Sequence, residues 1–180
     1  MFILYAIPIG IVAGYLTGGR LEGLGGLQFH WAPVAILGLI VQIVLFSAPL
    51  TENIGDLGPP TYVASTAAVL VAVVRNSAIP GVAVVAVGAA SNLLAIVANG
   101  GYMPADSVAL AAIGGIAPAY SNSTVIAHPA LVPLTDIFAL PTWVPFTNVF
   151  SVGDMLIGVG VAGAIAIAMR HGRAEGARSG

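Results

Sequence analysis

The sequence predicts an all-α polytopic membrane protein, in which five transmembrane helices carry a proline-rich cap segment on the extracytoplasmic side. The chain has 180 residues, of which 58% are apolar and only 7% are charged. Soluble domains carry about 25% charged residues. The mean hydropathy is +1.02, and the apolar residues gather in long runs. Because a soluble fold could not bury so much apolar surface, we expect one membrane domain that covers residues 1–180.

Five apolar segments are expected to form the transmembrane helices, because each is near the ~20 residues that a ~30 Å hydrocarbon core requires. They cover residues 2–18, 32–50, 62–74, 79–98 and 152–169. The first has no basic residue before it, so we expect a retained helix instead of a cleaved signal peptide. The third is short for a span, so it needs the flanking Gly58-Pro-Pro60 or a snorkelling Arg75.

The arginines predict the orientation of the chain. All five basic residues follow the first, third or fifth span: Arg20, Arg75, Arg170, Arg173 and Arg178. The positive-inside rule then places the N-terminus outside and the tail 170–180 in the cytoplasm, as a basic, flexible anchor. An Ala, Val and Gly bias without lysine is typical of a bacterium with GC-rich DNA, so we expect a bacterial plasma membrane. The arginines form no nucleic-acid patch, so we expect no nucleic-acid partner.

Small and polar residues inside the spans predict helix packing. Gly10, Gly14 and Gly18 recur every four residues and leave one face of the first helix open for close approach, by a helix of this chain or of another subunit. Gln42 lies near the middle of the second span, where an interhelical hydrogen bond is expected. Asn92 in the fourth span has the same structural interpretation, with a ligand contact as its alternative.

The segment 99–151 cannot be a continuous helix, since six of the twelve prolines lie in it. Residues 107–117 are apolar but too few to span, which predicts a short re-entrant or interfacial helix. The rest is expected to be a folded cap on the outer helix ends, with its aromatic residues at headgroup level. Long ordered loops often carry function, so the cap is the best candidate for a site.

Five residues near the cap are candidate ligand-binding residues: Asn92, Asn99, Tyr102, Asp136 and Asp154. An acid within a span is a functional candidate, but Ser151-Val-Gly-Asp154 also fits a capping box at the start of the last helix. The chain has no cysteine, which excludes disulfides and thiolate ligands. We assign no catalytic residue, metal site or cofactor, although Asp136 and Asp154 could meet as an acid–base pair.

Three outer motifs and one inner motif resemble a known family. They are Asn99-Gly-Gly-Tyr-Met-Pro104, Asp136-Ile-Phe-Ala-Leu-Pro141, Asn148-Val-Phe-Ser-Val-Gly-Asp154 and the Gly-Gly-Arg20 that follows the first span. Together they are similar to the bacterial membrane family called domain of unknown function 5317, over nearly the whole chain. The resemblance implies a small polytopic bacterial membrane protein, and it carries over no mechanism.

Three functions are compatible with these features. The first is an accessory or scaffold subunit that packs within a larger bacterial membrane complex, favoured by the small size and the glycine-faced helices. The second is a binding or transport protein for a small apolar or lipid-like ligand, held between the helix ends and the cap. The third is an enzyme that acts on a lipid-linked substrate at the outer face. The lipid bilayer and other membrane subunits are the expected partners.

Overall fold

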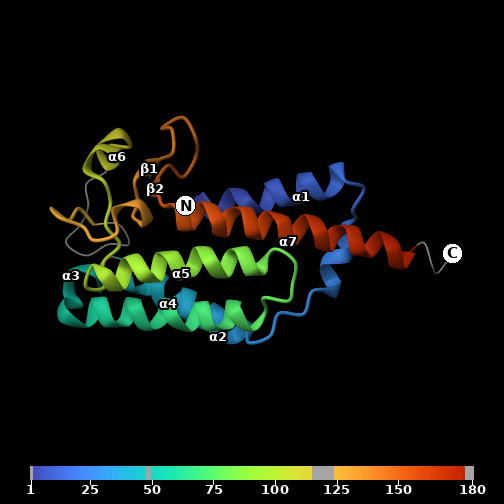
Figure 1. Cartoon of the computed structure of the whole chain (residues 1–180), viewed down its shortest axis with the longest axis horizontal. Coiled ribbons are helices and arrows are strands. Elements are labelled where there is room, and N and C mark those ends of the chain that lie inside the picture. The colour runs from blue at the N-terminus through green and yellow to red at the C-terminus, as the bar shows by residue number, and fades with distance from the viewer. Residues whose placement is uncertain (1, 48–49, 115–123, 177–180) are drawn as a thin grey trace.

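The chain forms a bundle of roughly antiparallel helices with a small cap at one end (Figure 1). The computed structural model describes residues 2–47, 50–114 and 124–176. The helices are α1 (Ala6–Leu16), α2 (Ala32–Leu45), α3 (Leu50–Asn53), α4 (Gly58–Arg75), α5 (Val82–Ala98), α6 (Ser107–Ala112) and α7 (Val152–Gly176). Helix α7 packs on α1 and on α5, and α4 packs on α2 and α5. Helix α7 therefore joins the two halves of the bundle.

Two of the five predicted spans reach the length that a membrane requires. Residues Gly55–Arg75 and Val152–Arg170 are long and apolar enough to cross a membrane, by length and composition. The third predicted span is one of them, because α4 takes in Pro59 and Pro60 at its first turn, where a missing N–H costs nothing. Helices α1, α2 and α5 are apolar but have only 11, 14 and 17 residues. Five transmembrane helices are thus more than the helix lengths alone support.

Proline and glycine account for two of the shorter helices. Pro8 offers no N–H to the carbonyl four residues before it, and residues Phe2–Tyr5 form a 3₁₀ turn instead of α-helix. Helix α5 begins at Val82 because Gly81 has a φ of 88°, which an α-helix cannot continue. The C-terminal tail, in contrast, is more helical than predicted. Helix α7 continues past Arg170 to Gly176, so most of the expected flexible tail is helical.

Glycines bring the backbone of α7 into direct contact with α1 and α5. A Cβ on Gly10 of α1 would lie 2.8 Å from the Ala162 carbonyl oxygen of α7. On the opposite side, a Cβ on Gly160 of α7 would lie 2.7 Å from the carbonyl oxygen of Gly81, which precedes α5. The predicted glycine face of α1 is therefore occupied by a helix of the same chain.

Polar side chains fasten the ends of the bundle. Asn76, which ends α4, accepts a hydrogen bond from the His30 amide and donates one to the His30 carbonyl, both at 2.7 Å. Asn99, which ends α5, binds Ala130 of the cap in the same manner, at 2.8 and 3.0 Å. Within the bundle, Gln42 donates to the Thr66 hydroxyl at 3.3 Å, which confirms the expected interhelical bond.

The cap contains α6 and a short antiparallel pair of strands, β1 (Phe138–Ala139) and β2 (Val149–Phe150). Residues Met103–Asp106 run between Thr124 and Asp136 and form bridges to both. The predicted short helix 107–117 exists as α6 but ends at Ala112, and its end beyond residue 114 lies outside the described residues. The two strands were not predicted from the sequence.

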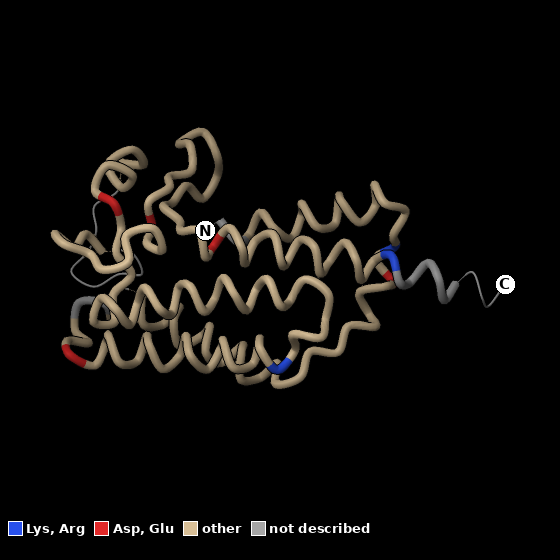
Figure 2. Tube along the Cα trace, in the orientation of Figure 1, with Lys and Arg blue, Asp and Glu red and all other residues tan. Residues whose placement is uncertain are grey.

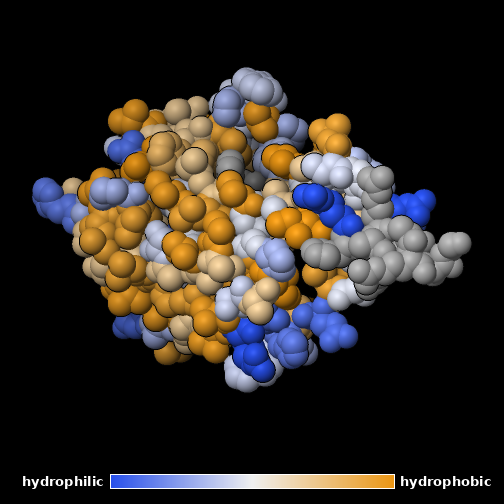
Figure 3. Space-filling model, turned by 45° about the vertical axis from the view of Figure 1, so that its right-hand side comes forward, coloured by the Kyte–Doolittle hydropathy of each residue, from blue (hydrophilic) through white to orange (hydrophobic). Residues whose placement is uncertain are grey.

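Charge and hydropathy are distributed unevenly over the molecule. Basic segments lie at the end of the bundle opposite the cap, and most acidic segments lie at the cap end (Figure 2). Apolar side chains cover a broad area of the face in Figure 3. Strongly exposed apolar residues occur on most of the helices, for example Leu16, Ile43, Val87 and Val159. Exposed apolar areas of this extent mark membrane or protein contacts.

The glycine contacts predict how single substitutions change stability. A Cβ on Gly88 would overlap the Gly153 carbonyl of α7 and lie 2.9 Å from the Ile157 nitrogen. We expect Gly88→Ala to destabilise the fold by about 1–3 kcal/mol, which lowers the Tm by roughly 3–10 °C. Thermal unfolding in detergent measures the change.

Gly163→Ala on α7 is the matched control, because a Cβ there meets nothing within 4 Å. It should leave the Tm unchanged or raise it, since alanine favours a helix over glycine by up to about 1 kcal/mol. Equal effects of the two substitutions would contradict the proposed backbone contact.

Candidate functional site

A small polar cavity lies where the cap-side ends of α4, α5 and α7 meet the cap. Its volume is about 130 Å³, which corresponds to about four water molecules at ~30 Å³ each. The lining combines the three helices with three cap segments: Tyr62, Asn92, Met103, Asp136, Asn148, Val149 and Asp154. The cavity therefore collects polar groups from parts of the chain that are far apart in sequence.

Ser151 and Asp154 form the predicted capping box at the start of α7. The Asp154 amide donates to the Ser151 hydroxyl at 3.0 Å, and the Ser151 amide donates to Asp154 Oδ2 at 3.1 Å. These bonds satisfy backbone donors that a helix N-terminus leaves open. The structural interpretation of this motif is confirmed, and the box also fixes the direction of the Asp154 carboxylate.

Asn92 of α5 bridges both residues of the capping box. Its Nδ2 donates to Asp154 Oδ1 at 2.8 Å, and its Oδ1 accepts from the Ser151 hydroxyl at 2.8 Å. The bridge requires glycine at position 153, because a Cβ there would overlap the Asn92 side chain. Each of the two Asp154 carboxylate oxygens thus accepts one hydrogen bond from the protein. Since a carboxylate has about four acceptor positions, capacity for a ligand remains.

Asp136 reaches the cavity from the cap. Its backbone amide donates to the Pro104 carbonyl at 2.9 Å, and its carbonyl accepts from the Asp106 amide at 2.9 Å. The residue is only 4% exposed. The cap therefore holds a second carboxylate at the cavity, on a short stretch of extended backbone that is itself paired.

Asn148 adds a further acceptor. Its Nδ2 donates to the Val149 carbonyl at 2.8 Å, so its Oδ1 points away from that carbonyl. That oxygen is buried, and no hydrogen-bond donor for it lies among the described residues. A buried acceptor without a donor costs about 1–3 kcal/mol unless water or a ligand satisfies it.

The cavity is electrostatically one-sided. Two carboxylates and an amide oxygen line it, and no arginine or histidine lines it among the residues that the structure describes. The described arginines lie at the opposite end of the bundle (Figure 2). Among the described residues, no group of three His, Cys, Asp or Glu side chains is placed to hold a metal ion. The arrangement can supply oxygen ligands and negative charge, but it lacks the ligand set of a structural transition-metal site.

The structure brings together three of the five candidate residues, Asn92, Asp136 and Asp154. Asn99 does not line the cavity, because its amide holds Ala130 of the cap. Tyr102 packs against an apolar cluster that includes Tyr62 and Met103. Their predicted ligand roles remain untested, but neither residue lines this cavity.

Sequence reasoning missed four residues of the lining: Tyr62, Met103, Asn148 and Val149. Met103, Asn148 and Val149 belong to the outer motifs, so the motifs themselves were the available signal. Tyr62 lies in the apolar run of α4, where no pattern distinguishes it from an interfacial or core tyrosine.

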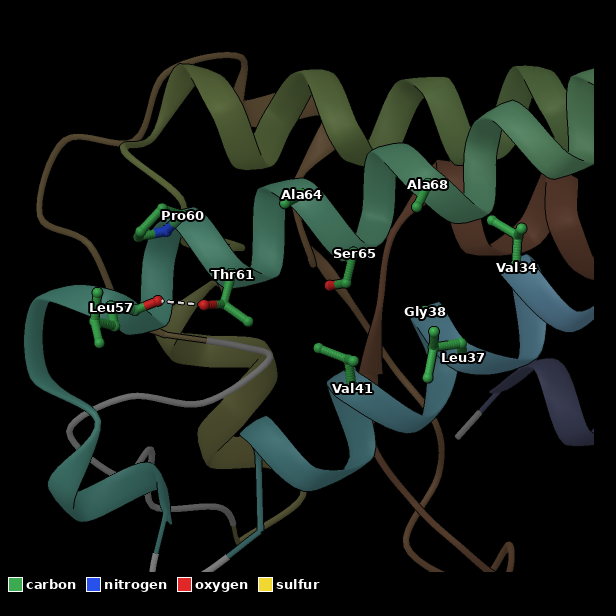
Figure 4. Close-up of a pocket in the computed structure, with 10 residues that line it drawn as sticks. All are labelled: Val34, Leu37, Gly38, Val41, Leu57, Pro60, Thr61, Ala64, Ser65 and Ala68. Atoms are coloured by element: carbon green, nitrogen blue, oxygen red, sulfur yellow. Dashed lines mark hydrogen bonds between the residues drawn. The ribbon is translucent and has the colours of Figure 1, made fainter.

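Three larger hollows are apolar. One, of about 540 Å³, lies between α2 and α4 (Figure 4). The second, of about 440 Å³, lies between α1, α7 and the loop that joins β1 to β2, and the third, of about 400 Å³, lies on α1. Among the described residues, no charged side chain lines any of them, so the polar cavity is the better candidate for recognition of a charged ligand.

The capping network predicts a large loss of stability when the Ser151 hydroxyl is removed. Ser151→Ala deletes the helix cap, worth about 1 kcal/mol, and leaves Asn92 Oδ1 without its donor, which costs a further ~1–3 kcal/mol. We expect a lower Tm in detergent. The control is Ser47→Ala, whose exposed hydroxyl donates to the Val44 carbonyl and whose loss should change stability by less than about 0.5 kcal/mol. Similar Tm values for both variants would refute the network.

Comparison with known proteins identifies the family but no activity. No characterised protein and no solved structure matches the chain. A family model described as "Family of unknown function (DUF5317)" matches residues 26–166. The matched region includes the three outer motifs and every residue that lines the polar cavity. The chain therefore belongs to the DUF5317 family.

Proposed function

We propose that the protein is a membrane-embedded binding protein that holds a small cation in the polar cavity at its outer end. The observation that carries the proposal is the meeting of Asp136, Asp154 and the buried Asn148 oxygen at one cavity. Oxygen atoms of this kind are the ligands that hard cations prefer. The cavity has room for an ion or a primary ammonium group with a few waters.

Size and charge argue against the larger ligand expected from the sequence. A lipid-like molecule does not fit a volume of about 130 Å³, and its apolar part would meet a polar lining. Two carboxylates that face one small space repel each other, and a cation between them removes that repulsion. The acid–base enzyme expected from the sequence stays a prediction. The two hydrogen bonds that the Asp154 carboxylate accepts hold it in one orientation, which favours a role as a fixed ligand of a cation over a role in proton transfer.

We place all five long helices in the membrane, with the cap outside and the arginines in the cytoplasm. Supporting this, two helices have the required length and composition. The other three expose large apolar side chains such as Ile9, Leu37 and Val87. The separation of basic and acidic segments to opposite ends of the bundle fits the positive-inside rule. The cavity then opens toward the extracytoplasmic side.

Cation binding predicts a specific gain in stability. A cation at about 100 times its Kd should stabilise the fold by about 2.7 kcal/mol, which raises the Tm by roughly 5–10 °C. Thermal unfolding in detergent is measured with Na⁺, K⁺, Mg²⁺, Ca²⁺ and ethylammonium at constant ionic strength. At least one of these should raise the Tm of the wild type, and Asp136→Asn or Asp154→Asn should abolish the increase.

The control for this experiment is Asp56→Asn. Asp56 is an exposed acid in the turn before α4, and it does not line the cavity. This variant should retain the full Tm increase of the wild type. If no cation raises the Tm, or if all variants respond alike, the proposal is wrong.

An accessory subunit is the second candidate function, and a different observation favours it. The glycine face of α1 no longer supports it, since α7 occupies that face. The groove between α2 and α4 remains open, and its α4 side presents Thr61, Ser65, Ala64 and Ala68 at four-residue spacings (Figure 4). Small residues at this spacing allow close helix approach in membranes.

The groove presents mostly carbon surface to a partner. The Thr61 hydroxyl donates to the Leu57 carbonyl at 2.6 Å, and the Ser65 hydroxyl donates to the Tyr62 carbonyl at 3.0 Å. Val34, Leu37 and Val41 of α2 form the opposite wall. A transmembrane helix of another subunit would fit such a surface.

This candidate predicts that a bulky residue in the groove releases a partner. Wild type purified in mild detergent should carry another membrane protein, identified by mass spectrometry, and Ala64→Leu should lose it. Val71→Leu on the same helix is the control, because Val71 is exposed outside the groove. A wild-type chain that purifies alone, or a partner retained by Ala64→Leu, would count against the accessory role.

A further inference from the structure

The apolar hollow beneath the β1–β2 loop lies beside the first turns of α7. Its volume is about 440 Å³. Ala6 and Ile9 of α1 form one wall, and Met155 and Val159 of α7 form the other. Leu140 and Val144 of the loop also line it. The hollow is thus bounded by two helices and by an ordered segment of the cap.

Hydrogen bonds hold the loop in place over the helices. The Tyr5 hydroxyl, at the start of α1, donates to the Pro145 carbonyl. The Thr147 hydroxyl donates to the carbonyls of Pro141 and Val144 at 2.9 and 2.8 Å. The loop conformation is therefore fixed both by a contact with α1 and by contacts within the loop.

The lining selects an apolar ligand. It consists of carbon and one methionine sulfur, apart from the Tyr5 hydroxyl, which is already hydrogen-bonded to the loop. A polar ligand would lose its hydrogen bonds to water without replacement, at a cost of at least ~1–3 kcal/mol per group. The ligand must therefore be hydrocarbon at this position.

A second apolar hollow, of about 400 Å³, lies on α1 and is lined by Pro8, Ile9, Val12, Ala13 and Leu16, so that Ile9 lines both hollows. We refer to the two neighbouring hollows together as the α1 track. Hollows that follow one another on the same helix suit an elongated, flexible ligand. An alkyl chain is a single row of methylene groups, whereas a helix is about 10–12 Å wide with its side chains.

We propose that this track binds one acyl chain of a bilayer phospholipid. The loop beside the hollow carries Trp143, which is 84% exposed, and Phe146, which is 71% exposed. Such aromatic residues favour the headgroup level of a bilayer. With the loop at that level, the hollow opens into the outer leaflet, where acyl chains surround it. The proposal rests on the membrane embedding proposed above and is independent of cation binding.

Photolabelling tests this site. The full chain is reconstituted in phosphatidylcholine vesicles that contain phosphatidylcholine with a diazirine in its acyl chain. After illumination, labelled peptides are quantified by mass spectrometry. Peptides of α1 and the outer half of α7 should be labelled more strongly than those of α5, whose exposed apolar side chains line none of the apolar hollows and report ordinary surrounding lipid. Val159→Trp, which fills the hollow from an exposed position, should reduce this labelling to the α5 level.

Val87→Trp on α5 is the control, because Val87 is similarly exposed and lines neither hollow. It should leave the labelling of α1 and α7 unchanged. Ile9→Trp replaces Val159→Trp if the latter does not reconstitute. Labelling of α1 and α7 no stronger than that of α5, or insensitive to the filling variants, overturns the proposal. A chain that does not enter vesicles overturns the embedding as well, whereas the cation test in detergent is decided separately.

Discussion

Direct backbone contact between α7 and its two neighbours is the constraint on which the site depends. Glycines at positions 10 and 88 let the backbones of α1 and α5 approach α7 without intervening side chains. Because α5 lies so close, the short side chain of Asn92 can reach both Ser151 and Asp154. Gly153 leaves the space that this side chain occupies. A separation larger by one methyl group would leave the start of α7 without its bridge to α5.

The cap supplies the part of the polar cavity that the helices lack. The helices alone provide one carboxylate, at the N-terminus of α7, where an acid also stabilises the helix. The second carboxylate belongs to a cap segment that pairs with the residues following α5. Asn99 fastens another part of the cap to the end of α5. The polar cavity therefore exists only when bundle and cap are assembled, which gives the unusual proline-rich segment a physical role.

The polar cavity and the apolar hollows lie in parts of the molecule that differ in charge and hydropathy. Negative charge gathers at the cap end, positive charge at the other, and carbon surface lies between them. Asp154 and Met155 are consecutive, yet the first lines the polar cavity and the second lines the apolar track under the loop. The start of α7 thus separates a site suited to a cation from one suited to hydrocarbon.

Sequence patterns predicted the helices and the capping box well because these depend on local chemistry. Hydropathy located every long helix, and Ser151 with Asp154 has the spacing of a capping box. The helix starts were shifted where Pro8 and Gly81 act on the backbone. The partners of the glycines could not be predicted, since Gly88 and Gly160 lie in uniform apolar runs. Nor could Asn148, because its role depends on a buried oxygen that only the folded cap positions. Two-residue strands are too short to leave a sequence pattern.

Anomalous X-ray scattering from crystals grown with Rb⁺ or with Sr²⁺ locates a bound cation directly. These ions replace common monovalent and divalent cations and can be located individually. We expect an anomalous peak within coordinating distance of the Asp136 and Asp154 carboxylates, and no such peak in the Asp136→Asn, Asp154→Asn double variant. Well-ordered carboxylates with peaks only elsewhere on the molecule would contradict this expectation.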